Sequence, residues 1–321
     1  IIGGEQKMNN KNNDISTVGV IGAGTIGSSW AAYFLAHGLK VRCWDPLDGY
    51  AENVNALVAR AWPIMTELGL ADGASLDNLT CYDRITEALD GVQFVQESGP
   101  EDAEIKALLM AEIDRDIPED VVISSSSTAL PVSEYQHLAA HPGRIVLGHP
   151  FNPPHLMPVV EVGGGKLTET RAVDQAMAFY DAIGKTPIRL RAEIPGHLVN
   201  RLQAALYREA VYLVAEGYAS VEDIDKAITG GPGLRWAFMG PHMTYHLGGG
   251  DGGIRRYLEN LGPSQERRWE ALGDPQLTDE VKQKIIDGVD AEAHGRTIGE
   301  LTTDRDATLL KLLKALGSGK D

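Results

Sequence analysis

The sequence Val18-Gly-Val-Ile-Gly-Ala-Gly-Thr-Ile-Gly27 is the most informative part of the chain, because a short β-branched run leads directly into three spaced glycines. In this pattern, Gly22 allows a tight turn after a buried strand, Gly24 lets the backbone approach a pyrophosphate, and Gly27 lets the next helix pack close to the sheet. The helix that begins after Gly24 would direct its N-terminal amides and positive dipole end at the phosphates. The stretch therefore predicts a dinucleotide-binding strand, turn and helix.

A glycine pattern alone is weak evidence for a dinucleotide site, but the residues that follow this loop strengthen the prediction. Leu39-Lys-Val-Arg-Cys-Trp-Asp45 is typical of a second strand that ends in an acid, 21 residues after Gly24. A carboxylate at about this distance usually binds the adenosine ribose hydroxyls. Asp45 would also repel a 2′-phosphate, which favours NAD over NADP as the cofactor. The alternative for Asp45 is a turn residue at the strand end, before Pro46.

Composition limits the classes of function. The formal charge of −16 and the isoelectric point near 5.0 argue against nucleic acid or an anionic membrane as a partner, because a polyanion would be repelled. No apolar run reaches the roughly 18 residues that span a bilayer, and no basic-then-apolar signal pattern is present. Cys43 and Cys81 fit neither a metal site nor a CxxC motif. We expect a soluble, cytoplasmic protein without a metal site.

The order of strand and helix patterns predicts two domains, and 321 residues are enough for two cores. Short apolar strands alternate with helical patterns in the first part, which indicates an α/β, Rossmann-type, doubly wound parallel sheet. Strand signals stop after Pro195, and helical patterns with glycine or proline breaks follow. We predict a flexible leader at residues 1–14, an NAD-binding domain at 15–193 and an all-helical substrate and dimerisation domain at 194–321.

A histidine follows a predicted strand in Gly148-His-Pro-Phe-Asn-Pro-Pro154, and ligands of open α/β sheets bind at the carboxyl ends of strands. Glu161 lies 12 residues later in an apolar strand, where a carboxylate needs a partner to offset its burial. If that partner is His149, the carboxylate would fix the imidazole tautomer and leave the other ring nitrogen to take a hydroxyl proton. The alternative is a loop histidine and an edge-strand glutamate without a catalytic role.

Together these motifs carry a family resemblance. The glycine loop, His149-Pro-Phe-Asn-Pro153, the Val-Val-Glu-Val around Glu161 and Pro195-Gly-His-Leu-Val-Asn-Arg201 resemble the 3-hydroxyacyl-CoA dehydrogenase superfamily. The resemblance implies that His149 is the general base and that Glu161 orients it. It also implies that Asn200 and a hydroxyl residue hold the substrate oxygen.

The hydroxyl position falls on Thr128, where the family usually has serine. Threonine keeps the hydroxyl but adds a methyl group and restricts χ1, which leaves the contact open between Thr128 and Ser127. The resemblance further implies that Glu101 and Lys106 lie on the nicotinamide-ribose side, whereas spacing alone would favour a solvated helix pair. The expected cofactor contacts are Gly22, Gly24, Thr25, Ile26, Gly27, Asp45, Glu101, Lys106 and Asn152.

Residues 233–240, Gly-Leu-Arg-Trp-Ala-Phe-Met-Gly, differ from the acyl-CoA enzymes of the superfamily. They resemble the branch of carnitine 3-dehydrogenases and L-gulonate 3-dehydrogenases, and the later sequence is most similar to the carnitine enzymes. This resemblance implies oxidation of the 3-hydroxyl of a short 3-hydroxy acid, with L-carnitine expected first and L-gulonate or a 3-hydroxyacyl-CoA as alternatives. An inactive, crystallin-like NAD-binding structural protein is the alternative of another class.

Charge and aromatic character agree in part with a carnitine substrate. Arg235 offers a planar bidentate donor for a carboxylate, and Trp236 and Phe238 offer faces for a trimethylammonium group. The alternatives are a structural salt bridge for Arg235 and core packing for the aromatic rings. The amphipathic run at residues 306–316 is of a kind often buried between subunits, and the resembling enzymes are dimers. We therefore expect a homodimer, with packing inside the subunit as the alternative.

Overall fold

The computed structural model describes residues 15–317, so the predicted leader at residues 1–14 lies outside the described residues. The chain divides into two compact units. Of the described residues, the first unit comprises 15–200 together with 306–317, and the second comprises Arg201–Arg305. The boundary predicted between residues 193 and 194 lies in the segment that leads into helix α6 (Val199–Ala215).

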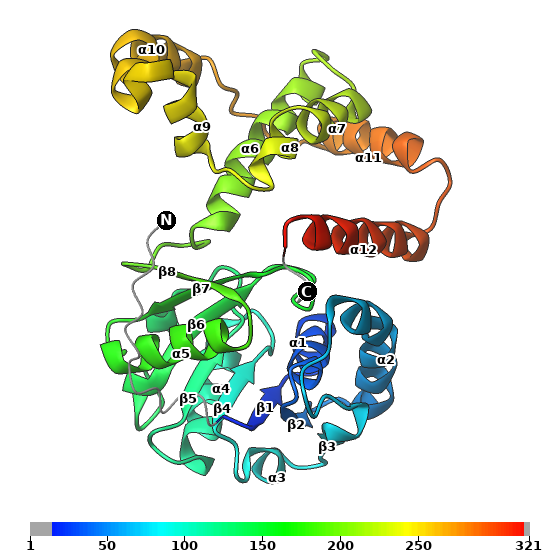
Figure 1. Cartoon of the computed structure of the whole chain (residues 1–321), viewed down its shortest axis with the longest axis vertical. Coiled ribbons are helices and arrows are strands. Elements are labelled where there is room, and N and C mark those ends of the chain that lie inside the picture. The colour runs from blue at the N-terminus through cyan, green and yellow to red at the C-terminus, as the bar shows by residue number, and fades with distance from the viewer. Residues whose placement is uncertain (1–14, 318–321) are drawn as a thin grey trace. The chain divides into compact units, whose positions relative to one another are not determined.

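An eight-stranded sheet forms the centre of the first unit, with the strand order β3-β2-β1-β4-β5-β6-β7-β8 (Figure 1). Strands β1 and β4 are neighbours although β2 and β3 lie between them in sequence, which is the doubly wound arrangement. The predicted fold class is therefore confirmed. The strands are β1 (Thr17–Ile21), β2 (Lys40–Trp44), β3 (Leu79–Cys81), β4 (Phe94–Glu97), β5 (Val122–Ser125), β6 (Ile145–Pro150), β7 (Val159–Gly164) and β8 (Thr186–Arg189).

The prediction of a wholly parallel sheet is wrong for the last two strands. Neighbouring strands are parallel from β3 through β6, but β7 runs antiparallel to β6, and β8 is parallel to β7. The reason is the short connection at residues 151–158, since a parallel crossover needs a dozen or more residues. The sheet is therefore mixed, and β6 and β7 form an antiparallel pair.

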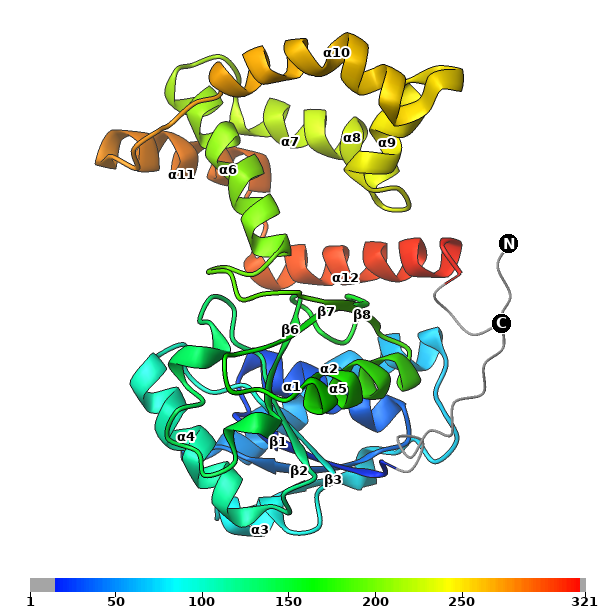
Figure 2. The same cartoon turned by 90° about the vertical axis from the view of Figure 1, so that its left-hand side faces the viewer.

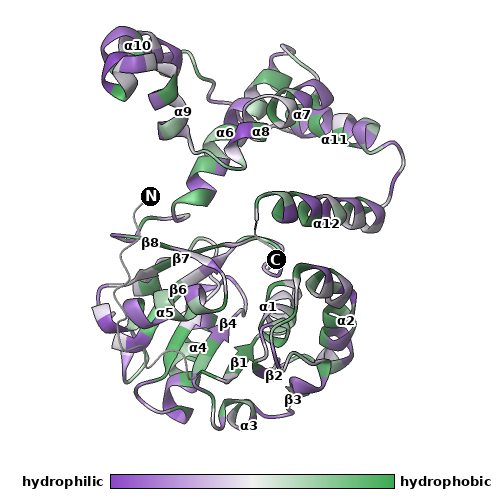
Figure 3. Cartoon of the chain, viewed as in Figure 1, coloured by the Kyte–Doolittle hydropathy of each residue, from purple (hydrophilic) through white to green (hydrophobic). Residues whose placement is uncertain are grey.

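Helices cover both faces of the sheet (Figure 2). One apolar core lies under α1, α2 and α5, and the other lies under α3 and α4. Successive side chains of β1 alternate between them, because Val20 belongs to the first core and Ile21 to the second. The apolar central strands are visible in Figure 3. The helices are α1 (Thr25–Ala36), α2 (Tyr50–Leu68), α3 (Ile85–Leu89), α4 (Ala103–Asp116) and α5 (Thr170–Ala182).

The glycine loop between β1 and α1 leaves no room for side chains at two positions. Gly22 has φ +95°, and a Cβ atom there would lie 2.6 Å from the carbonyl group of Ser98. A Cβ atom at Gly27 would lie 1.8 Å from the carbonyl oxygen of Gly22. The turn and the close packing of α1 on the sheet therefore both require glycine, as the sequence predicted.

Helices make up the second unit, and residues 201–305 contain no strand. The Ser220 and Thr278 hydroxyls cap α7 and α11, because each accepts from a backbone N–H group in the first turn of its helix. Among residues 15–317, no helix has both the length and the apolar character needed to cross a membrane. The helices from α7 onward are α7 (Val221–Gly230), α8 (Pro232–Trp236), α9 (Pro241–Gly248), α10 (Gly253–Glu270), α11 (Asp279–Ala293) and α12 (Ile298–Ala315), which crosses the boundary between the units.

Candidate active site

The antiparallel pairing of β6 with β7 brings His149 and Glu161 together. The two residues are directly opposite each other in the strand register. His149 Nδ1 lies 2.8 Å from Glu161 Oε2, and the two residues are 3% and 0% exposed. A buried carboxylate thus has the partner that its burial requires, and the imidazole is held through one of its two ring nitrogens.

The second carboxylate oxygen of Glu161 binds the start of α6. Oε1 accepts hydrogen bonds from the backbone N–H groups of Leu198, at 2.8 Å, and Val199, at 3.0 Å. Burial raises the pKa of Glu161, but the hydrogen bonds from His149 and from these two N–H groups outweigh burial and lower the pKa below its usual value. Glu161 is therefore ionised near neutral pH and joins His149 to the first turn of α6.

A second histidine, His197, lies beside His149, with 5.3 Å between the ring centroids. His197 is buried and has φ +52°, and its Nε2 atom lies 3.1 Å from the carbonyl oxygen of Ser127. Burial, and after it the repulsion from His149 when that ring is protonated, lower the pKa of His197, and its Nε2–H donates to that carbonyl. His197 lies within the motif at residues 195–201, but no catalytic or binding role was predicted for it from the sequence.

The turn that carries Thr128 is held by Glu101. Its Oε1 atom accepts from the Ser127 hydroxyl at 2.7 Å and from the backbone N–H groups of residues 128–130 at 2.8–3.2 Å. Burial raises the pKa of Glu101, but these hydrogen bonds lower it further than burial raises it. Asn200 Nδ2 donates to the Thr128 carbonyl oxygen at 2.9 Å. Thr128 and Asn200 are therefore neighbours, and Ser127 is buried while Thr128 is exposed.

Lys106 pairs with a residue that the sequence analysis did not name. Its Nζ atom lies 2.8 and 3.0 Å from the two carboxylate oxygens of Glu97, and both residues are buried. The Ser125 hydroxyl donates to the same carboxylate at 2.6 Å. The alternative of a solvated pair between Glu101 and Lys106 is therefore wrong. A glutamate that ends the apolar strand Phe94–Glu97 was the available signal, because a buried carboxylate needs a partner.

The glycine loop and the end of β2 border an open cavity of about 590 Å³, whose wall includes Gly24 and Asp45. A Cβ atom on Gly24 would meet nothing within 4 Å, so the backbone there faces open space. The Asp45 carboxylate accepts from the backbone N–H groups of Ala23, at 2.7 Å, and Leu47, at 2.9 Å. The contact with Leu47 is the turn role that was the alternative for Asp45. A carboxylate at a strand end beside an open glycine loop also fits an adenosine ribose and pyrophosphate.

Other predicted cofactor residues lie at the same edge of the sheet. Thr25 is exposed and Ile26 half-buried in the first turn of α1. Asn152 is exposed in the connection between β6 and β7. The structure contains no contact that tests their roles, so these remain predictions.

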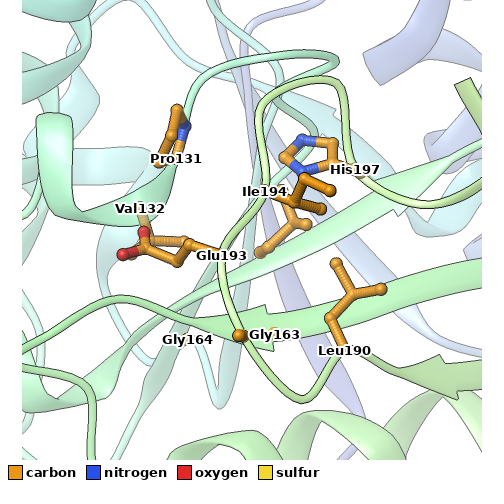
Figure 4. A pocket seen from close by; sticks show the side chains of 10 residues that line it. Pro131, Val132, Gly163, Gly164, Leu190, Glu193, Ile194 and His197 are labelled. Atoms are coloured by element: carbon orange, nitrogen blue, oxygen red, sulfur yellow. The ribbon is translucent and has the colours of Figure 1, made fainter. Parts of the chain in front are cut away.

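A much smaller cavity of about 10 Å³ lies beside the segment that precedes α6 (Figure 4). Leu190, Ile194 and His197 contribute side chains to its wall. Glu193 turns to Ser133, whose backbone N–H and hydroxyl donate to it at 2.8 and 2.6 Å. This space holds about one water molecule and is too small for a substrate.

The predicted substrate residues lie in the second unit. Arg235 and Trp236 belong to α8, and Phe238 follows it. Trp236 is 42% exposed and Phe238 is 67% exposed, so neither ring is packed in a core of the described chain. Their contact with a substrate stays a prediction.

The chain matches a known family over most of its length. Residues 17–194 match the NAD-binding domain of 3-hydroxyacyl-CoA dehydrogenase, and residues 196–287 match the C-terminal domain of the same enzyme. An L-carnitine dehydrogenase of Nocardiopsis dassonvillei is 48% identical, with 94% of this chain and 92% of the relative covered. An L-carnitine dehydrogenase of Streptomyces coelicolor is 46% identical, with 95% and 96% covered.

A solved structure agrees with these matches. The crystal structure of 5-formyl-3-hydroxy-2-methylpyridine 4-carboxylic acid 5-dehydrogenase, an NAD⁺-dependent dismutase, is similar with a TM-score of 0.81 and 26% identity. The similarity covers 95% of this chain and 100% of that chain. As its motifs predicted, the chain belongs to the 3-hydroxyacyl-CoA dehydrogenase family, and its first unit contains the NAD-binding domain of that family.

Proposed function

We propose that this protein is an NAD-dependent L-carnitine dehydrogenase that oxidises the 3-hydroxyl group of L-carnitine to a ketone. The observation that carries the proposal is the buried His149–Glu161 pair, in a chain whose nearly full-length relatives are L-carnitine dehydrogenases. The pair provides a base that can remove a hydroxyl proton. The names of the relatives indicate L-carnitine as the substrate.

His149 removes the proton in this proposal. Its Nδ1 atom is bound to Glu161, which leaves Nε2 to take the proton from the 3-hydroxyl group. The O–H electron pair then forms the carbonyl group as hydrogen leaves C3 with its bonding electrons. NAD, which the glycine loop and Asp45 would hold, would supply the hydride acceptor. The ionised Glu161 offsets the positive charge that His149 gains, because the two groups are in direct contact.

Thr128 and Asn200 hold the substrate oxygen in this proposal. Two observations favour Thr128 over Ser127 as the hydroxyl that contacts the substrate. The Ser127 hydroxyl is buried and donates to Glu101, whereas the Thr128 side chain is exposed beside Asn200. Two donors at the oxygen would favour the geometry in which the carbonyl forms.

We assign the cofactor to the glycine loop and the edge of the sheet beside it. Gly24, with Thr25 and Ile26 beside it, faces the pyrophosphate, a role that the open space at Gly24 supports. Gly22 and Gly27 serve the same site by permitting the tight turn and the close packing of α1. Asp45 binds the adenosine ribose. In this proposal Asn152, Glu101 and Lys106 complete the nicotinamide side. Lys106 is itself buried, and its ammonium group pairs with Glu97.

Arg235, Trp236 and Phe238 bind the two charged ends of the substrate in this proposal. L-Carnitine carries a carboxylate and a trimethylammonium group, and these need a cation and aromatic faces, respectively. The exposure of all three side chains leaves them accessible.

We further propose that the protein is a cytoplasmic homodimer. Large apolar side chains such as Leu258, Leu261 and Trp269 of α10 are 44–65% exposed, and a patch of this kind is commonly covered by a subunit. Cys43 and Cys81 are both free thiols, as in proteins of a reducing compartment.

A substrate screen tests the proposed activity. NADH formation is followed at 340 nm with L-carnitine, L-gulonate, 3-hydroxybutyrate and 3-hydroxybutyryl-CoA, and kcat/KM is compared. We expect L-carnitine to give the highest value. A higher kcat/KM for 3-hydroxybutyryl-CoA or L-gulonate would show that L-carnitine is not the preferred substrate. If none of the four compounds gives NADH although the protein binds NAD tightly, the inactive structural protein is favoured.

A further inference from the structure

The connection at residues 151–158 joins the two strands that carry His149 and Glu161. Its backbone turns at Pro153, whose carbonyl oxygen accepts from the N–H groups of Leu156 and Met157, both at 2.9 Å. A shift of this segment would move the ends of both strands, and it also carries Asn152, a proposed cofactor contact. What fixes the connection in place is therefore relevant to the reaction.

Lys185 reaches under this connection from the turn after α5. It is 4% exposed, and its ammonium group donates to the carbonyl oxygens of Pro154 and Met157, the latter at 3.0 Å. These two carbonyls belong to residues three positions apart in the turn that begins at Pro153. One side chain thus binds the connection at two points.

The surroundings of the Lys185 ammonium are aromatic. Nζ lies 3.6 Å from the ring centre of Tyr33 and 5.2 Å from that of Trp30, both in α1. Within residues 15–317, no carboxylate forms an ion pair with Lys185. Burial lowers the pKa of Lys185 well below its usual value, which shows that burial of the charge is costly here. An apolar residue would avoid that cost but would leave the two carbonyls unpaired.

Two further hydrogen bonds tie the same elements together. The Ser29 hydroxyl of α1 lies 2.7 Å from His155 Nδ1 and accepts from the His155 backbone N–H at 2.9 Å. The Tyr33 hydroxyl donates to the Ile183 carbonyl oxygen at 2.7 Å, two residues before Lys185. Helix α1, which begins at the glycine loop, is therefore bound to the connection and to the turn that carries Lys185.

We propose that Lys185 is a positioning residue that fixes the β6–β7 connection against α1, and so sets the distance between the cofactor loop and the His149–Glu161 pair. This inference rests on the proposed dehydrogenase function. Lys185 touches neither reacting atoms nor cofactor in this proposal. It acts through the carbonyls of Pro154 and Met157 and through the face of α1.

The test compares Lys185→Met, which keeps the chain length and removes both donors, with the wild type and with Lys166→Met, a change at an exposed lysine. We expect Lys185→Met to lower kcat on L-carnitine by about 10- to 100-fold at a temperature well below its melting point, because small misplacements are costly in orientation-dependent steps. Hydrogen exchange of a peptide that covers residues 151–158 should become faster. Lys185→Arg, which retains donors and charge, should recover part of both properties, and Lys166→Met should change neither.

Hydrogen exchange separates the failure of this inference from the failure of the proposed function, because it needs no substrate. Unchanged exchange in Lys185→Met overturns the inference whether or not L-carnitine is oxidised. Wild-type kcat in a folded Lys185→Met also overturns it, even if its melting temperature falls, since that result indicates a structural role alone. If Lys185→Met does not fold, Lys185→Gln, whose shorter side chain cannot bind both carbonyls, tests the same attachment, and unchanged exchange and kcat in that variant contradict the inference.

Discussion

Glu161 contacts two elements with two different oxygens. One oxygen holds the imidazole of His149, and the other accepts two backbone N–H groups at the start of α6. A glutamine at this position would keep the shape but lose the charge that both contacts use. Hydrogen bonds to a charged group contribute more than neutral ones, typically about 1.5–3 kcal/mol each.

The pKa of Glu161 gives a prediction for stability against pH. The pKa in the folded protein is lower than in the unfolded chain, so the carboxylate stabilises the fold fully above the unfolded value of about 4.3. This contribution is lost as the pH falls through the lower folded value. We expect Glu161→Gln to lower the free energy of unfolding by about 1–3 kcal/mol at pH 7, with a difference that shrinks below pH 4 or so.

Urea unfolding of wild type and Glu161→Gln at a series of pH values measures this difference. Glu134→Gln, at an exposed glutamate, serves as the matched control and should show little difference at any pH. If the loss of unfolding free energy in Glu161→Gln grew as the pH falls, the folded protein would not lower the pKa of Glu161, and the prediction would be wrong.

Part of the site could be predicted from the sequence, because a charged residue within an apolar strand pattern indicates a buried charge that needs a partner. Glu161 amid apolar strand residues required a partner, and His149 was the candidate. The same argument applied to Glu97, but nothing in the spacing indicated that Lys106 would be its partner. The residues that hold the turn at 127–130 and the β6–β7 connection were also unpredictable, because backbone carbonyl and N–H groups accept partners of many types and leave no sequence pattern.

Different glycines of the loop between β1 and α1 serve packing and ligand binding. A Cβ atom at Gly27 would lie 1.8 Å from the Gly22 oxygen, whereas a Cβ atom at Gly24 would meet nothing within 4 Å. Gly27→Ala should push α1 away from the sheet and destabilise the protein by about 1–3 kcal/mol. Gly24→Ala should leave stability near that of the wild type but weaken NAD binding at least about tenfold, because its methyl group occupies the side from which a phosphate approaches.

Thermal unfolding and NAD titration of the two variants check this division. Each variant is the control for the other, since the substitution is the same and the positions are three residues apart. Gly24→Ala with wild-type NAD affinity, or Gly27→Ala with wild-type stability, would show that the loop is arranged differently.

A hydrophobic pattern predicts that a strand such as β7 is present, but it does not predict the direction of the strand. The apolar run around Glu161 predicted a strand there, but such a run reads the same in either direction. The length of the connection at residues 151–158 contained the missing information, because it is too short for a parallel crossover. That direction has a functional consequence, since only the antiparallel register puts Glu161 opposite His149.

For the whole molecule, the exposed apolar side chains of the second unit give a prediction about assembly. Each chain has a mass of 34.6 kDa, so light scattering of the purified protein should give roughly 69 kDa, twice that value, at micromolar concentration. Dilution toward nanomolar concentration is the control for weak association. A mass of one chain at micromolar concentration would contradict the homodimer.

A comparison of wild type with His149→Gln tests whether this histidine is the base in L-carnitine oxidation. NADH formation from L-carnitine is followed at 340 nm, and the Kd for NAD is measured on both proteins. We expect L-carnitine-dependent NADH from the wild type and at least a 100-fold lower kcat in His149→Gln, the usual contribution of a general base. The Kd for NAD should remain near the wild-type value. Near-normal turnover in a folded His149→Gln, or no L-carnitine oxidation by a wild type that binds NAD, would contradict the account.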